Sequence, residues 1–501
     1  MLAYKPTNST AQSGALDLPL LLDEMPGPQS ARVHQGLRDA ILAGRLAPGS
    51  RLPASRALAA QFGIRRNTVV GAYEQLLSDG LAEARVGAGT FVAAHVPSGP
   101  ARPERIAMAD MVPGREVFAL GRTGVDALFQ SRLRRALSKR LQTLDPAHLG
   151  YGDPRGGREL RERLAEHLAV SRGVRCDPGH IVLVSGTQHG LQLCLGSVLR
   201  PGDVAWMEDP GYPAARKALE AAGAKLVPVP VDGHGLIVDE GRSRAPDARV
   251  AYVTPSHQFP TGVAMRMDRR IALLDWARDA DAWVLEDDYD SEFRYAGSPL
   301  TALAGMDAAQ RVIYFGTFSK VLFPGLRMGY VVLPPPLLEP VLAARAASDR
   351  FPPSLLEGAL ADLIAAGDFS AHIRRMRARY RTARDVVEAT LTVHAGGALR
   401  VVVPDQGLHL VARLQPDPPP GAAARIRDAA KVQAWLLSET RLQSGPSDGF
   451  VLGFSGHAIA ELRDGARRLA EAAAGFRTAF LGQHHKGASA RAGACEARPR
   501  A

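Results

Sequence analysis

Lys320 and Arg327 follow a short apolar run and have the side chains that bind an aldehyde and a phosphate. The run from Val312 to Phe315 is β-branched and aromatic, which predicts a buried strand that ends at Gly316. An amine just past a buried strand is poorly hydrated, so its pKa falls and it can attack an aldehyde. The guanidinium of Arg327, in a Pro-Gly-Leu-Arg loop, is suited to a phosphate. Taken alone, Lys320 is more often an ordinary surface lysine, so the hypothesis depends on the rest of the chain.

The acidic run EDDYD follows a second predicted strand, Trp283 to Leu285. A carboxylate beside a pyridine nitrogen keeps that nitrogen protonated, and the ring can then accept electrons. A tyrosine two residues after this carboxylate can hydrogen-bond a phenolic oxygen on the same pyridine ring. By itself such a run more often binds a metal or faces solvent.

Polar residues follow other predicted strands in the same way. The strand from Ile181 to Val184 leads into SGTQHG, whose small residues at a strand-to-helix junction expose N–H groups to a phosphate. Val204 to Met207 leads into EDPGY, which places Tyr212 at the sheet edge, where open α/β sheets bind ligands. Together these motifs favour pyridoxal 5'-phosphate, and we expect no metal site.

The N-terminal region has the pattern of a winged helix-turn-helix. An amphipathic helix is predicted from Ala31 to Ala43, a short helix from Ser55 to Gln61 and a second motif helix from Arg65 to Ser78. Leu81 to Val92 reads as a glycine-tipped hairpin, the wing. The alternative is a three-helix interaction module with a solvated basic face.

Charge supports nucleic acid as the partner of this region. Residues 26–95 hold eight arginines and four acidic residues, within a chain of net charge +10. Side chains that open a recognition helix reach base edges, and basic residues around it hold phosphates. The predicted base-reading residues are Arg65, Arg66, Asn67 and Thr68, and the predicted phosphate contacts are Arg51, Arg56 and Arg85.

Composition sets the remaining bounds. A chain of 501 residues with 46% apolar and 22% charged residues is long enough for two or three globular domains. No apolar run approaches a membrane span, and no signal sequence is visible. The three cysteines are too scattered for a disulfide framework or a zinc site, so we expect a protein of the reducing cytoplasm.

Two stretches resemble known families. GSRLPASRALAAQFGIRRNTVVGAYEQLLSDGL resembles the DNA-binding domain of GntR-type regulators, in which residues matching Arg56 and 65–68 contact DNA. The stretch from Tyr151 to Leu481 resembles fold-type I, class I/II aminotransferases, which are α/β proteins with a large and a small domain. The order of the two parts resembles the MocR/GabR/PdxR-type subfamily.

The resemblance implies a role for each motif residue. Lys320 would carry pyridoxal 5'-phosphate covalently, Asp287 would pair with its pyridine nitrogen, Tyr289 would contact its phenolic oxygen, and Tyr212 would stack on the ring. The residues implied around the phosphate are Gly186, Thr187, Gln188, Ser319 and Arg327. Tyr151 matches a tyrosine that reaches the neighbouring subunit's phosphate, which implies a homodimer.

The expected domains are a flexible start (1–29), a winged helix-turn-helix (30–95), a linker (96–115) and an aminotransferase-like domain (116–482). The small subdomain is expected from about residue 335, and a disordered tail from residue 483 to 501.

This chain departs from the metabolic enzymes at two points. Phe259 stands where the enzymes have an asparagine, with His257 nearby, which is the pattern of the regulator branch. The enzymes' C-terminal arginine, which grips a substrate carboxylate, is absent between Gly449 and Ala458. Neither His372 nor His409 is expected to be a ligand.

We therefore predict a DNA-binding transcription regulator that depends on pyridoxal 5'-phosphate and senses either this cofactor or an amine effector. One alternative is a working aminotransferase with an accessory DNA-binding domain. Another is a DNA-binding protein whose large domain serves only to dimerise. As an enzyme we expect partial transamination at most.

Overall fold

The computed structural model describes residues 27–96, 116–144, 149–443, 445 and 448–495. The chain divides into two compact units, Met1–Ala109 and Asp110–Ala501, and each is described by itself. Most of the predicted flexible start and all but the first residue of the predicted linker lie outside the described residues. The predicted domain boundaries stay predictions.

The N-terminal unit is the winged helix-turn-helix that its sequence predicts. Its elements are α1 (Gln29–Leu42), α2 (Ser55–Gln61), α3 (Arg66–Ser78), β1 (Ala82–Arg85) and β2 (Gly89–Val92). The two strands pair antiparallel, with Ala82 opposite Val92. Apolar positions on one side of each helix form a common core, in which Leu37, Leu58 and Leu76 are fully buried.

An eight-stranded sheet forms the centre of the second unit. Its order is β3-β10-β9-β8-β7-β4-β5-β6. The bounds are β3 (Ile181–Val184), β4 (Val204–Asp209), β5 (Lys225–Asp232), β6 (Gly235–Leu236), β7 (Val250–Val253), β8 (Trp283–Asp288), β9 (Val312–Thr317) and β10 (Gly329–Val332). Strands β5, β4, β7, β8 and β9 run parallel, while β10 is antiparallel to both of its neighbours. The predicted mainly parallel α/β sheet is confirmed.

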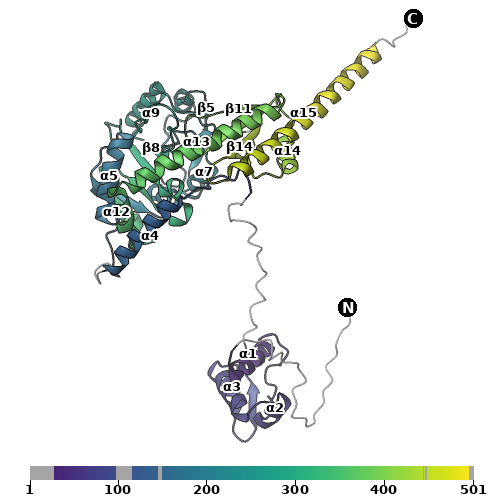
Figure 1. Cartoon of the computed structure of the whole chain (residues 1–501). Helices are drawn as coiled ribbons and strands as arrows, with labels where there is room; N and C mark the ends of the chain where they lie inside the picture. The colour runs from purple at the N-terminus through teal and green to yellow at the C-terminus, as the bar shows by residue number, and fades with distance from the viewer. Residues whose placement is uncertain (1–26, 97–115, 145–148, 444, 446–447, 496–501) are drawn as a thin grey trace. The chain divides into compact units, whose positions relative to one another are not determined.

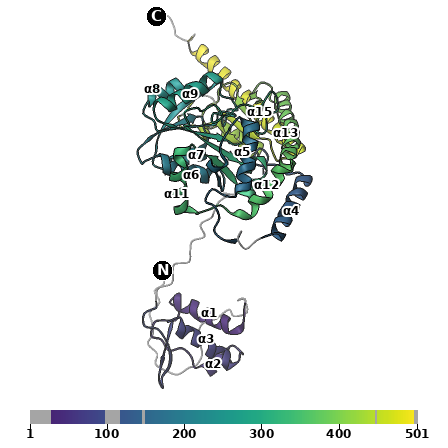
Figure 2. The ribbon, with the colours of Figure 1, turned by 90° about the vertical axis from the view of Figure 1, so that its left-hand side faces the viewer.

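Helices cover both faces of this sheet because its strands are apolar on both sides. In β3, Val182 and Val184 face one apolar core, whereas Ile181 and Leu183 face another. The first core includes α6 (Thr187–Val198), α7 (Pro213–Ala221) and α11 (Leu338–Ser348), of which α6 and α11 lie side by side in Figure 2. The opposite face is covered by α5 (Arg158–Arg172), α8 (Val238–Arg244), α9 (Met267–Asp279), α12 (Glu357–Ala365) and α13 (Asp368–His394), and α4 (Ala127–Gln142) packs on α12.

A smaller antiparallel sheet follows, in the order β11-β12-β14-β13. Its strands are β11 (Leu399–Val402), β12 (His409–Leu414), β13 (Trp435–Leu436) and β14 (Gly449–Gly453), with α14 (Ala422–Ala430) between β12 and β13. The last helix, α15 (Ile459–Cys495), packs along α13, as Figure 1 shows. α15 continues past residue 482, where the disordered tail was expected to begin, because alanines support a helix and no proline occurs before Pro499.

Parallel strands end at the same edge of a sheet, so β7, β8 and β9 bring the segments that follow them together. The short helix α10 (Phe318–Val321) begins directly after β9. Among the helices that the structure describes, none has the length and hydropathy of a membrane span.

The separate core of the N-terminal unit leads to a stability prediction. Leu76→Ala should lower the free energy of unfolding of this unit by about 2–5 kcal/mol, because it leaves a cavity in a fully buried position. Differential scanning calorimetry of the full chain should show a lower melting temperature for the N-terminal unit and an unchanged melting temperature for the second unit. The neighbouring exposed Gln75→Ala is the control. Equal shifts of both transitions would contradict independent cores.

Candidate cofactor and DNA-binding sites

A cavity of about 260 Å³ lies at the strand ends of the large sheet. Nine of the ten predicted cofactor residues line it: Gly186, Thr187, Gln188, Tyr212, Asp287, Tyr289, Ser319, Lys320 and Arg327. They come from the end of β8 and from the segments that follow β3, β4, β8 and β9, which are far apart in sequence. The cavity is thus built where the strand endings predict it, and the individual roles stay predictions.

Lys320 reaches the cavity from α10. Thr317 caps this helix by accepting a hydrogen bond from the Ser319 backbone N–H at 3.1 Å. Burial lowers the pKa of the Lys320 amine, while the carboxylates of Asp287 and Asp290 act in the opposite direction. The net lowering favours the neutral, nucleophilic amine.

Gly121 lies against the amine of Lys320. Sequence reasoning did not find this contact. The φ of Gly121 is +81°, and a Cβ there would lie 2.7 Å from Lys320 Nζ. A glycine is therefore required both for the backbone conformation and for the approach of the amine. Its position far upstream of Lys320, just before α4, gave no signal in the sequence.

Asp287 is buried with only half of its carboxylate satisfied. The Tyr252 hydroxyl donates to Oδ2 at 2.6 Å, whereas Oδ1 is buried without a hydrogen-bond partner among the described residues. Burial raises the pKa of Asp287 to about 7. A cation beside Oδ1 would satisfy this oxygen and lower the pKa again. A protonated pyridine nitrogen is such a cation, so the donor set fits the predicted cofactor.

The side of the cavity predicted to hold the phosphate is formed by the N-terminus of α6 together with Arg327. Gly186 precedes α6 at φ +114°, and a Cβ there would lie 3.9 Å from Arg327 Nη1. Arg327 itself has a left-handed backbone, with φ 52°, after a short 3-10 turn. Backbone N–H groups and a guanidinium converging on one space suit a phosphate.

Tyr212 forms part of the opposite wall. Its ring lies edge-on to that of Phe259, with centroids 5.3 Å apart, and burial raises the pKa of its hydroxyl to about 12. A buried network holds the Phe259 segment: the Phe259 N–H donates to Thr254 Oγ1, which donates to Glu208 Oε2 at 2.7 Å. Sequence reasoning assigned no role to Thr254 or to Glu208, the first residue of EDPGY, because their hydrogen bond joins segments that are far apart in the sequence.

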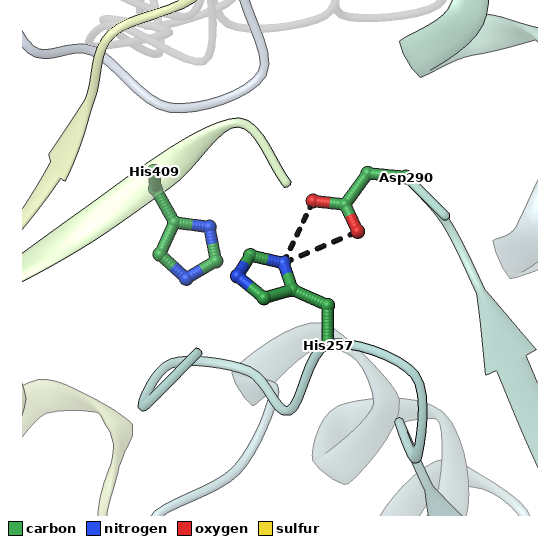
Figure 3. A group of neighbouring side chains, drawn as sticks. All are labelled: His257, Asp290 and His409. Atoms are coloured by element: carbon green, nitrogen blue, oxygen red, sulfur yellow. Dashed lines mark hydrogen bonds and ion pairs between the residues drawn. The ribbon is translucent and has the colours of Figure 1, made fainter. Parts of the chain in front are cut away.

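Three buried side chains next to Tyr289 have metal-ligand types: His257, Asp290 and His409 (Figure 3). His257 Nδ1 donates to Asp290 Oδ2 at 2.9 Å, and His409 Nε2 donates to the Pro260 carbonyl at 3.1 Å. The Tyr289 hydroxyl donates to the His257 carbonyl at 2.9 Å. We therefore interpret these residues as a hydrogen-bonded group that holds Tyr289 in position. His409, for which the sequence predicted a packing or surface role rather than that of a ligand, also lines the cavity.

Tyr151 is the one predicted cofactor residue that the structure does not bring to the cavity. Its side chain is 81% exposed and lies edge-on to Phe351, with ring centroids 5.8 Å apart. An exposed tyrosine is free to reach another molecule, which is the role that the family resemblance implies.

The predicted DNA contacts lie in the first turn of α2, at the start of α3 and around the wing. All are exposed except Thr68, which is half-buried: Arg51, Arg56, Arg65, Arg66, Asn67 and Arg85. The Arg85 guanidinium lies over the Phe91 ring, 4.4 Å from its centroid. Arg66 Nε donates to Ser55 Oγ at 3.3 Å, so this arginine also joins α2 to α3.

Comparisons with known proteins match both units. The family described as "Bacterial regulatory proteins, gntR family" matches residues 29–92, and "Aminotransferase class I and II" matches residues 127–447. The chain is 37% identical over 480 residues to the probable rhizopine catabolism regulatory protein MocR of Rhizobium meliloti, covering 92% of this chain and 95% of that protein. It belongs to the MocR-type GntR regulators.

Two further likenesses agree with this membership. The pyridoxine biosynthesis transcriptional regulator PdxR of Corynebacterium glutamicum is 31% identical over 454 residues, covering 88% of this chain and 95% of that protein. An archaeal alanine:glyoxylate aminotransferase of known structure aligns with a TM-score of 0.66 and 27% identity, over 71% of this chain and 90% of that one. The named relatives support a transcription regulator over a working aminotransferase for this MocR-type chain.

The close approach of Gly121 gives a test of the lysine's position. Gly121→Ala should reduce covalent trapping of a small aldehyde at Lys320 by borohydride, because the added methyl group displaces the amine. Mass spectrometry of the labelled peptide measures the change. The matched control is Gly202→Ala, which has φ +95° but nothing within 4 Å of the new Cβ. Equal trapping in both variants would mean that Gly121 does not position Lys320.

Proposed function

We propose that this protein is a DNA-binding transcription regulator whose aminotransferase-like domain holds pyridoxal 5'-phosphate. One observation carries the proposal: the Lys320 amine, the unpartnered Asp287 Oδ1 and the Gly186–Arg327 anion site line the same cavity. These are the three groups needed for an aldehyde, a ring nitrogen and a phosphate.

Each residue contributes a distinct physical effect. Lys320 supplies an amine, whose pKa is lowered by burial, for a covalent bond, and Asp287, oriented by the Tyr252 hydroxyl, would stabilise a positive charge at Oδ1. The α6 N-terminus, Ser319 and Arg327 would neutralise the phosphate charge. When bound, the cofactor supplies an aldehyde that exchanges amines and a ring that accepts electrons.

The side chains on the remaining walls of the cavity indicate which chemical class of effector fits. These walls are largely apolar, formed by Leu120, Phe259, Leu408 and Trp435, and the only lysine or arginine side chains among the lining residues are Lys320 and Arg327. Both are committed to the cofactor in this proposal. We propose an amine, or the cofactor itself, as the effector, since no further guanidinium lines the cavity to bind a carboxylate.

Exchange of the lysine for an effector amine would release Lys320 and change the contacts inside the cavity. Such a ligand shifts the protein between two states only if it binds them with different affinity. We propose that this change is transmitted to the winged helices of a cytoplasmic homodimer, in which Tyr151 reaches the partner's cavity. α3 would then read bases in the major groove.

The alternative function is a working aminotransferase, which the nearly complete cofactor site favours. Steady-state turnover with an amino acid and a 2-oxo acid separates the two functions. A regulator that holds the cofactor for sensing should show little or no complete transamination.

The lysine linkage is tested by absorption spectroscopy. Full-length protein mixed with pyridoxal 5'-phosphate should develop a visible band that borohydride abolishes, because Lys320 supplies the only amine in the cavity lining. Lys320→Ala should lack this band while keeping its fold by circular dichroism. If the wild-type protein lacks the band, the cofactor proposal is wrong, and the remaining interpretation is a DNA-binding protein whose large domain serves only to dimerise.

The DNA contacts are tested with a duplex selected from a random library. Arg65→Ala should weaken binding by about 1–3 kcal/mol relative to the wild type, because the side chain stands at the start of the recognition helix. Fluorescence anisotropy measures this, and the visible band should be unchanged.

The control is Arg45→Ala, which removes an exposed arginine from the turn after α1. It should affect selected and random duplexes alike, whereas Arg65→Ala should affect the selected duplex more. Loss of cofactor binding along with DNA binding in Arg65→Ala would contradict independent sites.

A further inference from the structure

A second cavity of about 260 Å³ lies on the other side of the acidic segment that follows β8. It is formed by α5, by residues 291–299 and by the first turns of α13. None of its lining residues belongs to the cofactor site, although the two cavities share the segment 287–292 as a wall.

Four arginines line this second cavity. Arg172 is engaged through all three guanidinium nitrogens, with Asp288, the Leu300 carbonyl and Ser256 Oγ, whereas the other three arginines keep N–H groups without a partner among the described residues. Arg172 is buried and pairs with Asp288 at 2.7 Å, and Arg377 donates to the Glu292 carbonyl at 2.6 Å. Arg294 donates to a glutamine oxygen at 3.1 Å through Nη1, while its buried Nε has no partner among the described residues. Arg374 is exposed and forms no hydrogen bond or ion pair with any described residue.

Neutral donors complete the lining. Ser291 Oγ and Glu292 Oε2 are buried atoms without a hydrogen-bond partner in the part of the chain that the structure describes. Burial, reinforced by Asp288 and Asp290 and opposed by Arg172, raises the pKa of Glu292 to about 8. A raised pKa favours the protonated carboxyl group, which can donate a hydrogen bond. Glu292 is the one acidic residue in the lining, so the cavity is electropositive.

We propose that this cavity binds a small phosphate-type oxyanion, such as a phosphate monoester. Guanidinium groups bind phosphate oxygens through paired hydrogen bonds, and serine hydroxyl groups add further donors. The volume exceeds what a bare phosphate needs, which leaves room for a small organic group. The site is separate from the anion site at Arg327.

Inorganic phosphate is the probe, and the full-length Arg327→Gln variant is the background, because it removes the guanidinium of the cofactor site. Phosphate should still bind this variant by isothermal titration calorimetry and raise its melting temperature. Adding Arg374→Gln or Ser291→Ala should weaken phosphate binding about tenfold or more, since each removes a donor to the anion. Arg374 has no structural partner, so its replacement should leave the fold intact.

Arg381→Gln is the matched control, since Arg381 is an exposed arginine two turns further along α13 and outside the cavity. It should leave phosphate binding unchanged. The proposal is overturned if the Arg327→Gln protein binds no phosphate. It is also overturned if Arg374→Gln and Ser291→Ala leave binding intact, or if Arg381→Gln weakens it equally, which would indicate general surface charge.

Discussion

The second unit depends on placing carboxyl groups inside an apolar sheet. Residues 286–292 contain five acidic side chains at the end of β8, and burying an unpaired charge is costly. Three of them are satisfied inside the fold. Glu286 accepts two backbone N–H groups at 2.9 Å each, Asp288 pairs with Arg172, and Asp290 accepts from His257. The neighbouring helices and loops are held in place by these contacts.

Two carboxyl groups of the same segment are left incomplete, and each belongs to a cavity. Asp287 Oδ1 lies at the cofactor cavity and Glu292 Oε2 at the arginine-lined cavity. Both groups have raised pKa values because of burial. A cationic ring nitrogen would supply the missing hydrogen bond to Asp287 Oδ1. Glu292, when protonated, can donate a hydrogen bond to an anion. The segment 287–292 thus offers a site for a positively charged group at one cavity and a site for an anion at the other.

The same physical logic separates the two units of the chain. The N-terminal unit encloses its own apolar core and keeps most of its arginines exposed, as a partner that carries many phosphates requires. The second unit instead buries its charges, so electrostatic interactions there are strong and specific. In the proposed function, screened surface charge would serve DNA binding and desolvated charge would serve the binding of a small ligand.

Sequence alone predicted the fold class, the strands β3, β4, β8 and β9 and most of the residues that line the cofactor cavity, because a buried strand followed by Gly, Lys or Asp is a local pattern. It predicted Lys320, Asp287 and Arg327 together for that reason. Only the tertiary structure brought Gly121 against the lysine and Tyr252 against Asp287, since these contacts join distant segments whose residue types are ordinary. The arginine-lined cavity was likewise invisible, because its donors come from three separate elements and converge only through packing.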